Sequence, residues 1–265
     1  MNIMKKMILA CAMIMAAAMA QAQTTIEDKV FDGETIRYVT ERLSCEELTA
    51  LLAFVPVDVT LYEGEEGAIE ISYPLAERPY INYGVENYEG KKALIIGRNG
   101  YVDIPKNTLL SEKVPIYVKL SASQLKLISG HADTMLRIER DKFAHDLTLK
   151  NGFVMAIVTE SITAANSLTI LNHGTMTCHV KEWNTACIDV YNAGYLYMHG
   201  QTTAKSVVHK CAKKSVNDVC LDVDCDNLQI FSRGKGVLRY RGMADDVQVS
   251  ALGKGCTIYT SELNQ

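Results

Sequence analysis

The residues with the clearest chemical potential form a run of aspartates in the C-terminal half. Asp222, Asp224 and Asp226 alternate with apolar residues. A strand would place these three carboxylates on one face, and calcium prefers several oxygen ligands of this kind. The spacing begins like a helix–loop–helix calcium loop, but Asn227 stands where that loop needs glycine and Arg233 where it needs glutamate.

We therefore interpret the aspartates, with Asp218 before them, as a solvated face balanced by cations on neighbouring segments. Opposite charges across strands stabilise by about 0.2–1 kcal/mol per pair. The neighbouring basic residues are His209, Lys210, Lys213, Lys214, Arg233, Lys235, Arg239 and Arg241. We predict no metal site, and the alternative that Asp222, Asp224 and Asp226 bind a cation stays open.

Cysteine and histidine also occur near one another. Cys178-His179 with Cys187, and His209 with Cys211, suggest zinc ligands by residue type. We favour structural thiols and surface histidines, and we expect Cys178 to be a buried free thiol.

No enzyme motif is recognisable. Ser-His-Asp and phosphate-loop patterns are missing from the sequence, and no spacing singles out an acid–base pair. We therefore predict no catalytic, cofactor-binding or metal-ligating residues and no cofactor. The aromatic side chains could line a sugar-binding face, but tyrosines at strand positions are more often packing residues; these are Trp183, Tyr195, Tyr197, Phe231 and Tyr240.

These residues lie within a repeat. Apolar positions recur at intervals of 22, 21, 20, 20, 20 and 19 residues, at Leu125, Leu147, Leu168, Ile188, Val208, Leu228 and Val247. Each unit has apolar first and third positions, the period of a strand, and most have glycine at position six or seven, where we expect a turn with positive φ. A period near 20 residues with many β-branched residues predicts a parallel β-helix of about seven coils.

Two further register positions support coil stacking. Asn151, Asn172 and Asn192 each lie four residues after their unit's start, so we predict a hydrogen-bonded asparagine ladder. Ten residues after the start, the units place the apolar core candidates Ile157, Cys178, Met198 and Leu238. The Val208 unit has Ala212 and Lys214 in place of asparagine and glycine, so we expect a distorted turn there.

The first 22 residues are typical of an export signal. Lys5 and Lys6 precede an uncharged apolar stretch, and Ala20-Gln21-Ala22 predicts cleavage after Ala22. Lipidation at Cys11 is the less favoured alternative. No other stretch approaches the ~20 apolar residues of a membrane span, so we predict an exported protein located in the periplasm, at the outer membrane surface or outside the cell.

The net charge limits the classes of possible binding partner, and the number of cysteines limits the possible disulfide pairing. The net charge of −4 becomes −6 without the signal, which argues against nucleic acid and anionic membranes as partners. Seven cysteines remain, an odd number that cannot all pair within one chain. One disulfide among Cys187, Cys211, Cys220 and Cys225 is compatible with the sequence.

Residues 23–120 have a different sequence pattern. Alternating patterns at 57–61 and 69–73 around a glycine-rich turn predict a hairpin, and residues 92–96 and 116–120 predict further strands. The capping box that begins at Ser44 predicts a short helix over 44–53.

This N-terminal order resembles a known family. Leu48–Gly64, with its proline and a Val-x-Leu-x-x-Gly pattern, and Pro115–Leu120 follow the plan of the head GIN domain family of Bacteroidetes-type bacteria; the glycine-punctuated turns at 233–237 and 252–256 are similar to its coils. The resemblance covers residues 36–260, although the family's Gly-Ser-Gly turns are degenerate here. It implies an exported β-helical, autotransporter-adhesin-like protein and a strand rather than a helix over 44–53.

We thus expect an all-β chain with a signal peptide (1–22), an antiparallel capping portion (23–120) and a parallel β-helix (121–265). The expected function is non-enzymatic binding or adhesion to a surface glycan or protein through a repetitive face. Two alternatives stay open, a polysaccharide lyase or hydrolase on a β-helix and a purely structural protein of the cell envelope. The ligand, the oligomeric state and the thiol pairing do not follow from the sequence.

Overall fold

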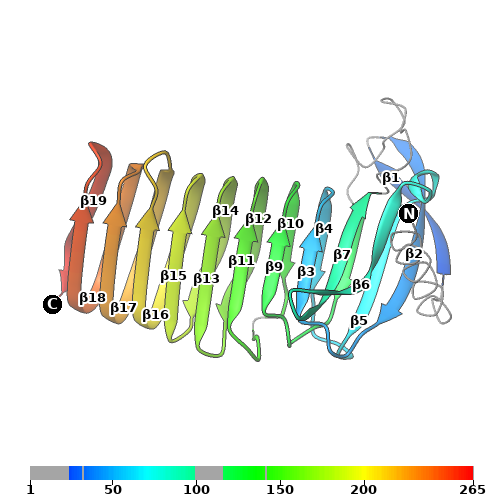
Figure 1. Cartoon of the computed structure of the whole chain (residues 1–265), viewed down its shortest axis with the longest axis horizontal. Coiled ribbons are helices and arrows are strands. Elements are labelled where there is room, and N and C mark those ends of the chain that lie inside the picture. Colours follow the sequence, from blue (N-terminus) through cyan, green and yellow to red (C-terminus); the bar gives the residue numbers. More distant parts are fainter. Residues whose placement is uncertain (1–23, 32, 99–115, 141, 265) are drawn as a thin grey trace, which may run out of the picture.

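Parallel strands stacked coil upon coil form a β-solenoid of about seven turns over residues 127–264. The structure is a computed structural model that describes residues 24–31, 33–98, 116–140 and 142–264. Figure 1 shows the coils along the long axis, with the N-terminal strands gathered at one end. The expected signal segment, residues 1–22, lies outside the described residues.

The solenoid has two parallel sheets, and each coil contributes one strand segment to each. The first sheet contains β9 (Leu127–Gly130), β11 (Leu147–Asn151), β13 (Ser167–Asn172), β15 (Cys187–Asn192) and the second halves of β16 (Tyr195–Cys211), β17 (Val216–Ser232) and β18 (Lys235–Ala251). The second sheet contains β10 (Thr134–Ile138), β12 (Val154–Thr163), β14 (Thr175–Asn184), the first halves of β16–β18, and β19 (Gly255–Asn264).

The register confirms most of the predicted column and corrects two members. Leu147 pairs with Leu168, and Leu168 pairs with Ile188. Ile188 pairs with Val207 rather than Val208, so the register predicted there was wrong by one residue. Two adjacent valines make either choice compatible with a strand pattern, and only the pairing decides between them.

Leu125 is the second corrected member of the column. Leu125 lies before the start of β9. The apolar residue of β9 that pairs in the first sheet is Ile128, and its partner is Leu149. Beyond Val207 the column continues as predicted, through Leu228 to Val247.

The asparagine ladder is confirmed. Nδ2 of Asn151 donates to Oδ1 of Asn172 at 2.8 Å, and Asn172 repeats the contact to Asn192 at 2.8 Å. The next rung is Asn217, which accepts from Asn192 at 2.7 Å. In strand register Asn192 faces Cys211, and the turn between Cys211 and Val216 is two residues longer than the turn between Asn192 and Tyr195, so the distorted turn is also confirmed.

The turn glycines serve a purpose other than the one predicted. Gly174 and Gly194 do not have positive φ. A Cβ atom on Gly194 would overlap with the carbonyl oxygen of Gly174, and one on Gly174 would overlap with that of Phe153. Glycine therefore lets successive turns stack closely, and positive φ occurs elsewhere, at Gly200, Gly236 and Gly242 among others.

The lumen is filled by apolar side chains from both sheets. The second-sheet column predicted from Ile157, Cys178, Met198 and Leu238 is confirmed, because these residues stack in register and are fully buried. One continuous apolar cluster extends from Val39 in the N-terminal portion to Ala244 in the last coils. Burial along this whole length stabilises the stack at roughly 25 cal/mol per Å² of apolar surface.

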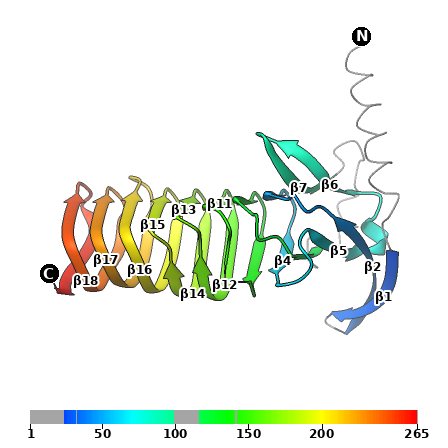
Figure 2. The ribbon, with the colours of Figure 1, turned by 90° about the horizontal axis from the view of Figure 1, so that it is seen from below.

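The N-terminal portion is a mixed sheet with antiparallel strands. β1 (Thr24–Phe31), β2 (Glu34–Ser44), β5 (Ala68–Pro74) and β8 (Ile116–Leu120) pair antiparallel in that order, and β6 (Ile81–Tyr88) pairs antiparallel with β7 (Lys91–Arg98). β3 (Ala50–Ala53) and β4 (Val57–Leu61) pair in parallel with β9 and β10, so they join the mixed sheet to the solenoid. The views in Figures 1 and 2 show these strands at the end of the rod that is opposite the C-terminus.

The predicted hairpin was wrong in its pairing. β4 and β5 are strands as expected, but β8 lies between them, parallel to β4 and antiparallel to β5. Alternation within 57–61 and 69–73 identified the strands correctly, and it carries no information about a third strand that enters from 116–120. That strand and the one at 92–96 are confirmed.

The short helix predicted from the capping box was also wrong. Ser44 ends β2, and Ala50–Ala53 form the strand β3 that the family resemblance implied. Leu51 packs into the main core while Ala50 and Leu52 pack into a second cluster, so both faces of β3 are buried. An apolar run buried on two faces is typical of a parallel strand. Among the described residues, no helix has the length and apolar character that crossing a bilayer requires.

Candidate functional site

A wide groove lies over the second sheet. It has a volume of about 1060 Å³, begins at the end of β10 and crosses β12, β14 and the first halves of β16, β17 and β18. The ionisable residues that line it include Glu139, Glu160, His179, Lys181, Glu182, Tyr197, His199, Cys220, Asp222 and Arg241. The groove therefore runs along the stacking direction and takes residues from several coils.

Bends in the strands accompany the groove. The register between β14 and β16 shifts between His179 and Glu182, and Gly200 lies there with φ +139°. A Cβ on Gly200 would overlap with the carbonyl oxygen of Val180, which explains the need for glycine. Gly242 has φ +101° and lies in the same way against Val223. Positive φ at Gly200 and Gly242 therefore sets the backbone direction in these two coils.

Three aromatic rings form a ladder in the groove. The rings of Tyr197 and His199 stack at 4.2 Å with an interplanar angle of 16°, and His179 on the neighbouring strand lies 5.6 Å from Tyr197. Tyr197 and His199 are two residues apart on β16, so both point outward from the same face. The His179 ring is tilted by 47° to the ring of Tyr197, so the three rings form one continuous aromatic cluster on the outer face of the sheet.

Charged groups of both signs surround the rings. Asp222 accepts a hydrogen bond from Nε of Arg241 at 2.7 Å, and this pairing raises the pKa of the guanidinium. Asp218 lies 3.5 Å from Nε2 of His199, and Lys181 forms an ion pair with Glu160. The groove is therefore polar and internally paired, and it can offer several acceptors and donors to a hydroxylated ligand.

The aspartate run has the outward alternation predicted for it. Asp222 pairs with Arg241 as the charge-balance interpretation expected, while Asp224 and Asp226 lie exposed. The described part of the chain contains no group of three or more His, Cys, Asp or Glu side chains placed to hold a metal ion.

His209 corrects that interpretation. It was expected on the solvated basic face but is fully buried in the lumen, because the one-residue register change at Val207 turns it inward. Nδ1 of His209 lies 2.6 Å from the hydroxyl of Tyr240, and burial lowers the histidine pKa to about 4. Nε2 has no hydrogen-bond partner among the described residues.

The five aromatic candidates divide into three groups. Trp183 and Tyr240 are fully buried and belong to the core. Tyr195 and Phe231 are each 40 % exposed, and only Tyr197 lines the groove. The packing interpretation is therefore confirmed for two residues.

All seven described cysteines are free thiols, including the four considered for a disulfide. Cys178 is buried as predicted, and burial raises its pKa to about 12. Cys220 and Cys225 have the spacing of a zinc pair but differ in surroundings, since Cys225 is buried and Cys220 lines the groove.

A buried carboxylate in the mixed sheet was missed by the sequence reasoning. Glu41 accepts hydrogen bonds from the hydroxyls of Tyr73, at 2.8 Å, and Tyr83, and it lies 3.4 Å from Arg78. The three partners come from segments 32 to 42 residues away, so no local spacing marks the cluster. Burial and the carboxylate raise the pKa of Tyr73 to about 12. The carboxylate has three donors around it and ties β2, β5 and β6 together.

Comparison with known proteins places the fold among solved structures. No protein-family model matches this sequence, and no curated protein does. Several solved structures resemble it, and three of them are each described as a "putative adhesin". The one from Bacteroides fragilis has a TM-score of 0.54 and 13 % identity, covering 84 % of this chain and 96 % of its own.

The other two come from Parabacteroides. The protein from Parabacteroides merdae has a TM-score of 0.53 and 16 % identity, and covers 90 % of this chain and 100 % of its own. The protein from Parabacteroides distasonis has a TM-score of 0.55 and 15 % identity, covering 84 % and 97 %. At these identities the likeness is one of fold, and this chain is a β-solenoid similar to those of adhesin-like proteins from Bacteroidetes.

Proposed function

We propose that this protein is an exported, non-enzymatic binding module of the adhesin type, and that the groove over the second sheet contacts a glycan. The observation that carries the proposal is the ring ladder of His179, Tyr197 and His199 within a groove of about 1060 Å³. The description of three similar folds as adhesins supports the class of function, and membership of the head GIN domain family is part of the proposal.

The chemistry of the groove favours a hydroxylated ligand. The faces of sugar rings are apolar and stack on aromatic rings, while their hydroxyls hydrogen-bond to side chains such as Glu182, Gln201 and Asp222 along the same wall. Because the groove crosses several coils, it suits an extended chain of sugars. The signal expected in residues 1–22 supports export to the periplasm, the outer membrane surface or the exterior.

The test is a binding screen of the mature protein, residues 23–265, against neutral and charged polysaccharides. Tyr197→Ala should weaken binding to the selected glycan by about tenfold, since one aromatic contact contributes roughly 0.5–1.5 kcal/mol beyond its buried area. Tyr195→Ala is the matched control, because Tyr195 is on the same strand, exposed, and not part of the groove lining. Equal affinity of both variants would contradict the groove as the site.

The same screen separates the alternatives. The carboxylates of Glu139, Glu160 and Glu182 lie along one groove, and this favours a polysaccharide lyase or hydrolase as the second candidate. Release of shorter sugars from any polysaccharide would establish that alternative. Absence of binding to every glycan and protein surface tested would favour a purely structural envelope role. A separate measurement tests the prediction that the protein has no metal site: loss of stability on adding a chelator would contradict it.

A further inference from the structure

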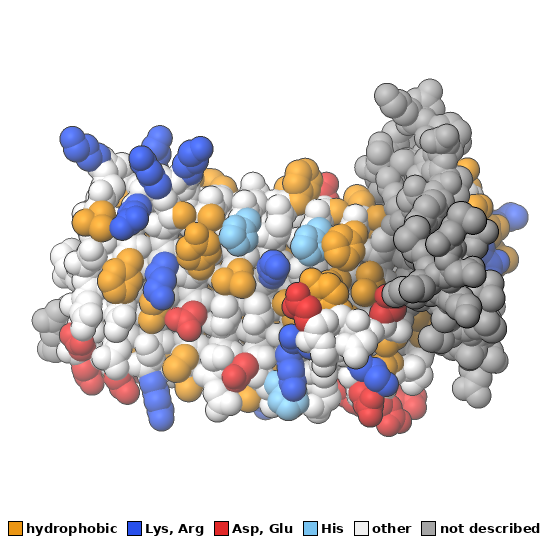
Figure 3. Space-filling view, viewed as in Figure 1, with side chains coloured by type: hydrophobic (Ala, Val, Ile, Leu, Met, Phe, Trp, Pro, Cys, Tyr) orange, Lys and Arg blue, Asp and Glu red, His pale blue; other side chains and the backbone are white. Residues whose placement is uncertain are grey.

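Five cationic side chains share one edge of the last coils. They are Lys213, Lys214, Arg233, Lys235 and Lys254, which lie on three successive turns between the two sheets. The turn segments 211–216, 232–236 and 251–256 contain no acid. Cys211 pairs with Ser232 and Ser232 with Ala251, so the turns lie one above another. Figure 3 shows basic side chains gathered along this edge at the C-terminal end. We name these five residues the basic edge.

The basic edge is uncompensated within the described residues. All five side chains are exposed, and none of them has an acidic group within ion-pair distance in the part of the chain that the structure describes. Several cations elsewhere on the surface are paired, as Arg37 is with Asp28 and Lys92 with Glu47. Like charges stacked on neighbouring strands or turns repel one another, so an anionic partner would relieve a repulsion that the fold leaves in place.

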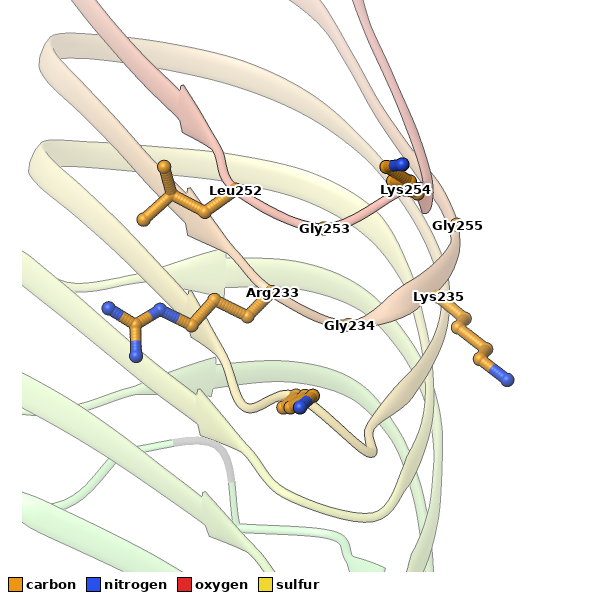
Figure 4. A pocket seen from close by; sticks show the side chains of 8 residues that line it. Arg233, Gly234, Lys235, Leu252, Gly253, Lys254 and Gly255 are labelled. Atoms are coloured by element: carbon orange, nitrogen blue, oxygen red, sulfur yellow. The ribbon is translucent and has the colours of Figure 1, made fainter.

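A hollow of about 580 Å³ lies between these turns. It is lined by Lys213, Arg233, Lys235 and Lys254 and by the backbone of intervening glycines. In Figure 4, Arg233 and Lys235 project from either side of Gly234, and Lys254 lies in the turn of the next coil. A Cβ on Gly234 would overlap with Oγ of Ser215. Glycine therefore keeps the turn close to its neighbour, with the charges at the rim of a backbone-lined hollow.

Exposed rings continue from the basic edge onto the first sheet. A second hollow of about 410 Å³ is lined by Tyr191, Lys210, Phe231 and Leu252 together with Arg233. Tyr191, Lys210 and Phe231 stack in register on three strands, and both rings are about 40 % exposed, at 37 % and 40 %. Cations beside exposed rings suit a polymer whose units carry both an anionic group and an apolar ring face.

We propose that the basic edge binds an anionic polysaccharide, with carboxylate or sulfate groups on the lysines and Arg233 and with sugar rings against Tyr191 and Phe231. The cations occupy a single column of turns, which fits a linear chain better than a planar bilayer. The net charge of the whole chain, −4, disfavours anionic partners on average, but the acids are absent from these three turns. This site is independent of the groove on the second sheet.

The experiment measures binding of residues 23–265 to polygalacturonate and dextran sulfate, with uncharged dextran as the reference. We expect binding to at least one of the two charged polymers, none to dextran at this site, and an affinity that falls at least about tenfold between 50 and 200 mM salt, since counterions are released on binding. Binding to one charged polymer only would assign the carboxylate or the sulfate as the recognised group.

Two charge-matched variants locate the site. Arg233→Gln/Lys235→Gln/Lys254→Gln should lose at least about tenfold in affinity at 50 mM salt. The control Arg37→Gln/Lys92→Gln/Arg137→Gln removes the same number of cations at positions paired with acids, and it should bind as the unmodified protein does. Equal losses in both variants would overturn the proposal, as would tighter binding to single-stranded DNA or to phosphatidylglycerol vesicles than to either polysaccharide. Tyr197→Ala should leave this binding unchanged, which separates a failure here from a failure of the groove.

Discussion

Asn172 donates a hydrogen bond to Asn192 over 2.8 Å, and both side chains are fully buried in the solenoid. Asn172 also donates to the carbonyl oxygen of Tyr195 at 2.7 Å, accepts from Asn151 at 2.8 Å and accepts from the backbone N–H of Gly174 at 3.2 Å. One amide therefore satisfies backbone groups of its own turn and of the coil above. Because a buried polar group without a partner is costly, the ladder fixes the register of successive coils.

Replacing Asn172 with alanine should destabilise the protein by about 3–5 kcal/mol. The substitution leaves the amide of Asn151 and the carbonyl of Tyr195 each short of a buried hydrogen bond, and each such group costs about 1–3 kcal/mol. Urea denaturation followed by circular dichroism measures the change in the free energy of unfolding.

The matched control for that substitution is Asn166→Ala. Asn166 is exposed and its side chain donates to Asp146 across the surface, among the described residues; loss of this side chain should change the free energy of unfolding by less than about 0.5 kcal/mol. Similar losses for both asparagines would show that the ladder does not hold the coils in register.

Gly194→Ala should be destabilising by about 1–3 kcal/mol, the usual cost of forcing extra volume into a packed region. The added methyl group would overlap with the carbonyl of Gly174, so two turns must separate. Gly84→Ala provides the comparison, because a Cβ at Gly84 meets nothing within 4 Å and its φ is not positive. Thermal denaturation should show a lower Tm for the first variant and little change for the second, and equal Tm values would contradict the close-stacking explanation.

The repeat predicted the solenoid because every coil must place apolar residues in the same column. Leu147, Leu168 and Ile188 could be aligned from sequence because their spacings, 21 and 20 residues, differ by only one. The alignment failed at Val207, because β16 has one residue fewer than β14 between the paired positions on either side of the register shift. A one-residue change inverts which side chains face inward, and it hid the burial of His209.

The groove could be predicted only in part. Tyr197 was recognised as an aromatic at a strand position, and alternation with the core position Met198 places it outward, whereas Tyr240, two residues after the core position Leu238, lies in the lumen. Gly200 in the groove and Gly242 next to Arg241 have positive φ and lie against the backbone of neighbouring coils, and local sequence does not show these contacts. The basic residues of the edge were visible in the sequence, whereas their lack of acidic partners depends on the stacking of distant turns.

Cys187 should be the first thiol to react in the native protein. It is the exposed member of the seven described cysteines, whereas Cys178 and Cys211 are buried with pKa values raised to about 12 by desolvation. Thiolate, and not thiol, is the nucleophile, so the buried pair should stay unmodified until unfolding. Titration with Ellman's reagent at pH 8 should give one fast phase that Cys187→Ser removes. A fast phase that persists in this variant would contradict the assignment.

His209 should make stability fall as the pH is lowered from about 6.5 towards 4. Its folded pKa of about 4 lies below the usual 6.5 because burial disfavours the imidazolium, so the unfolded chain binds the proton first in this window. With 1.36 kcal/mol per pKa unit, the contribution between pH 7 and 5 is about 2 kcal/mol. Urea denaturation at both pH values measures it, and His209→Leu, combined with Tyr240→Phe to avoid an unpaired hydroxyl, should show a correspondingly smaller change. An unaltered pH dependence in the double variant would mean that His209 does not titrate as its burial requires.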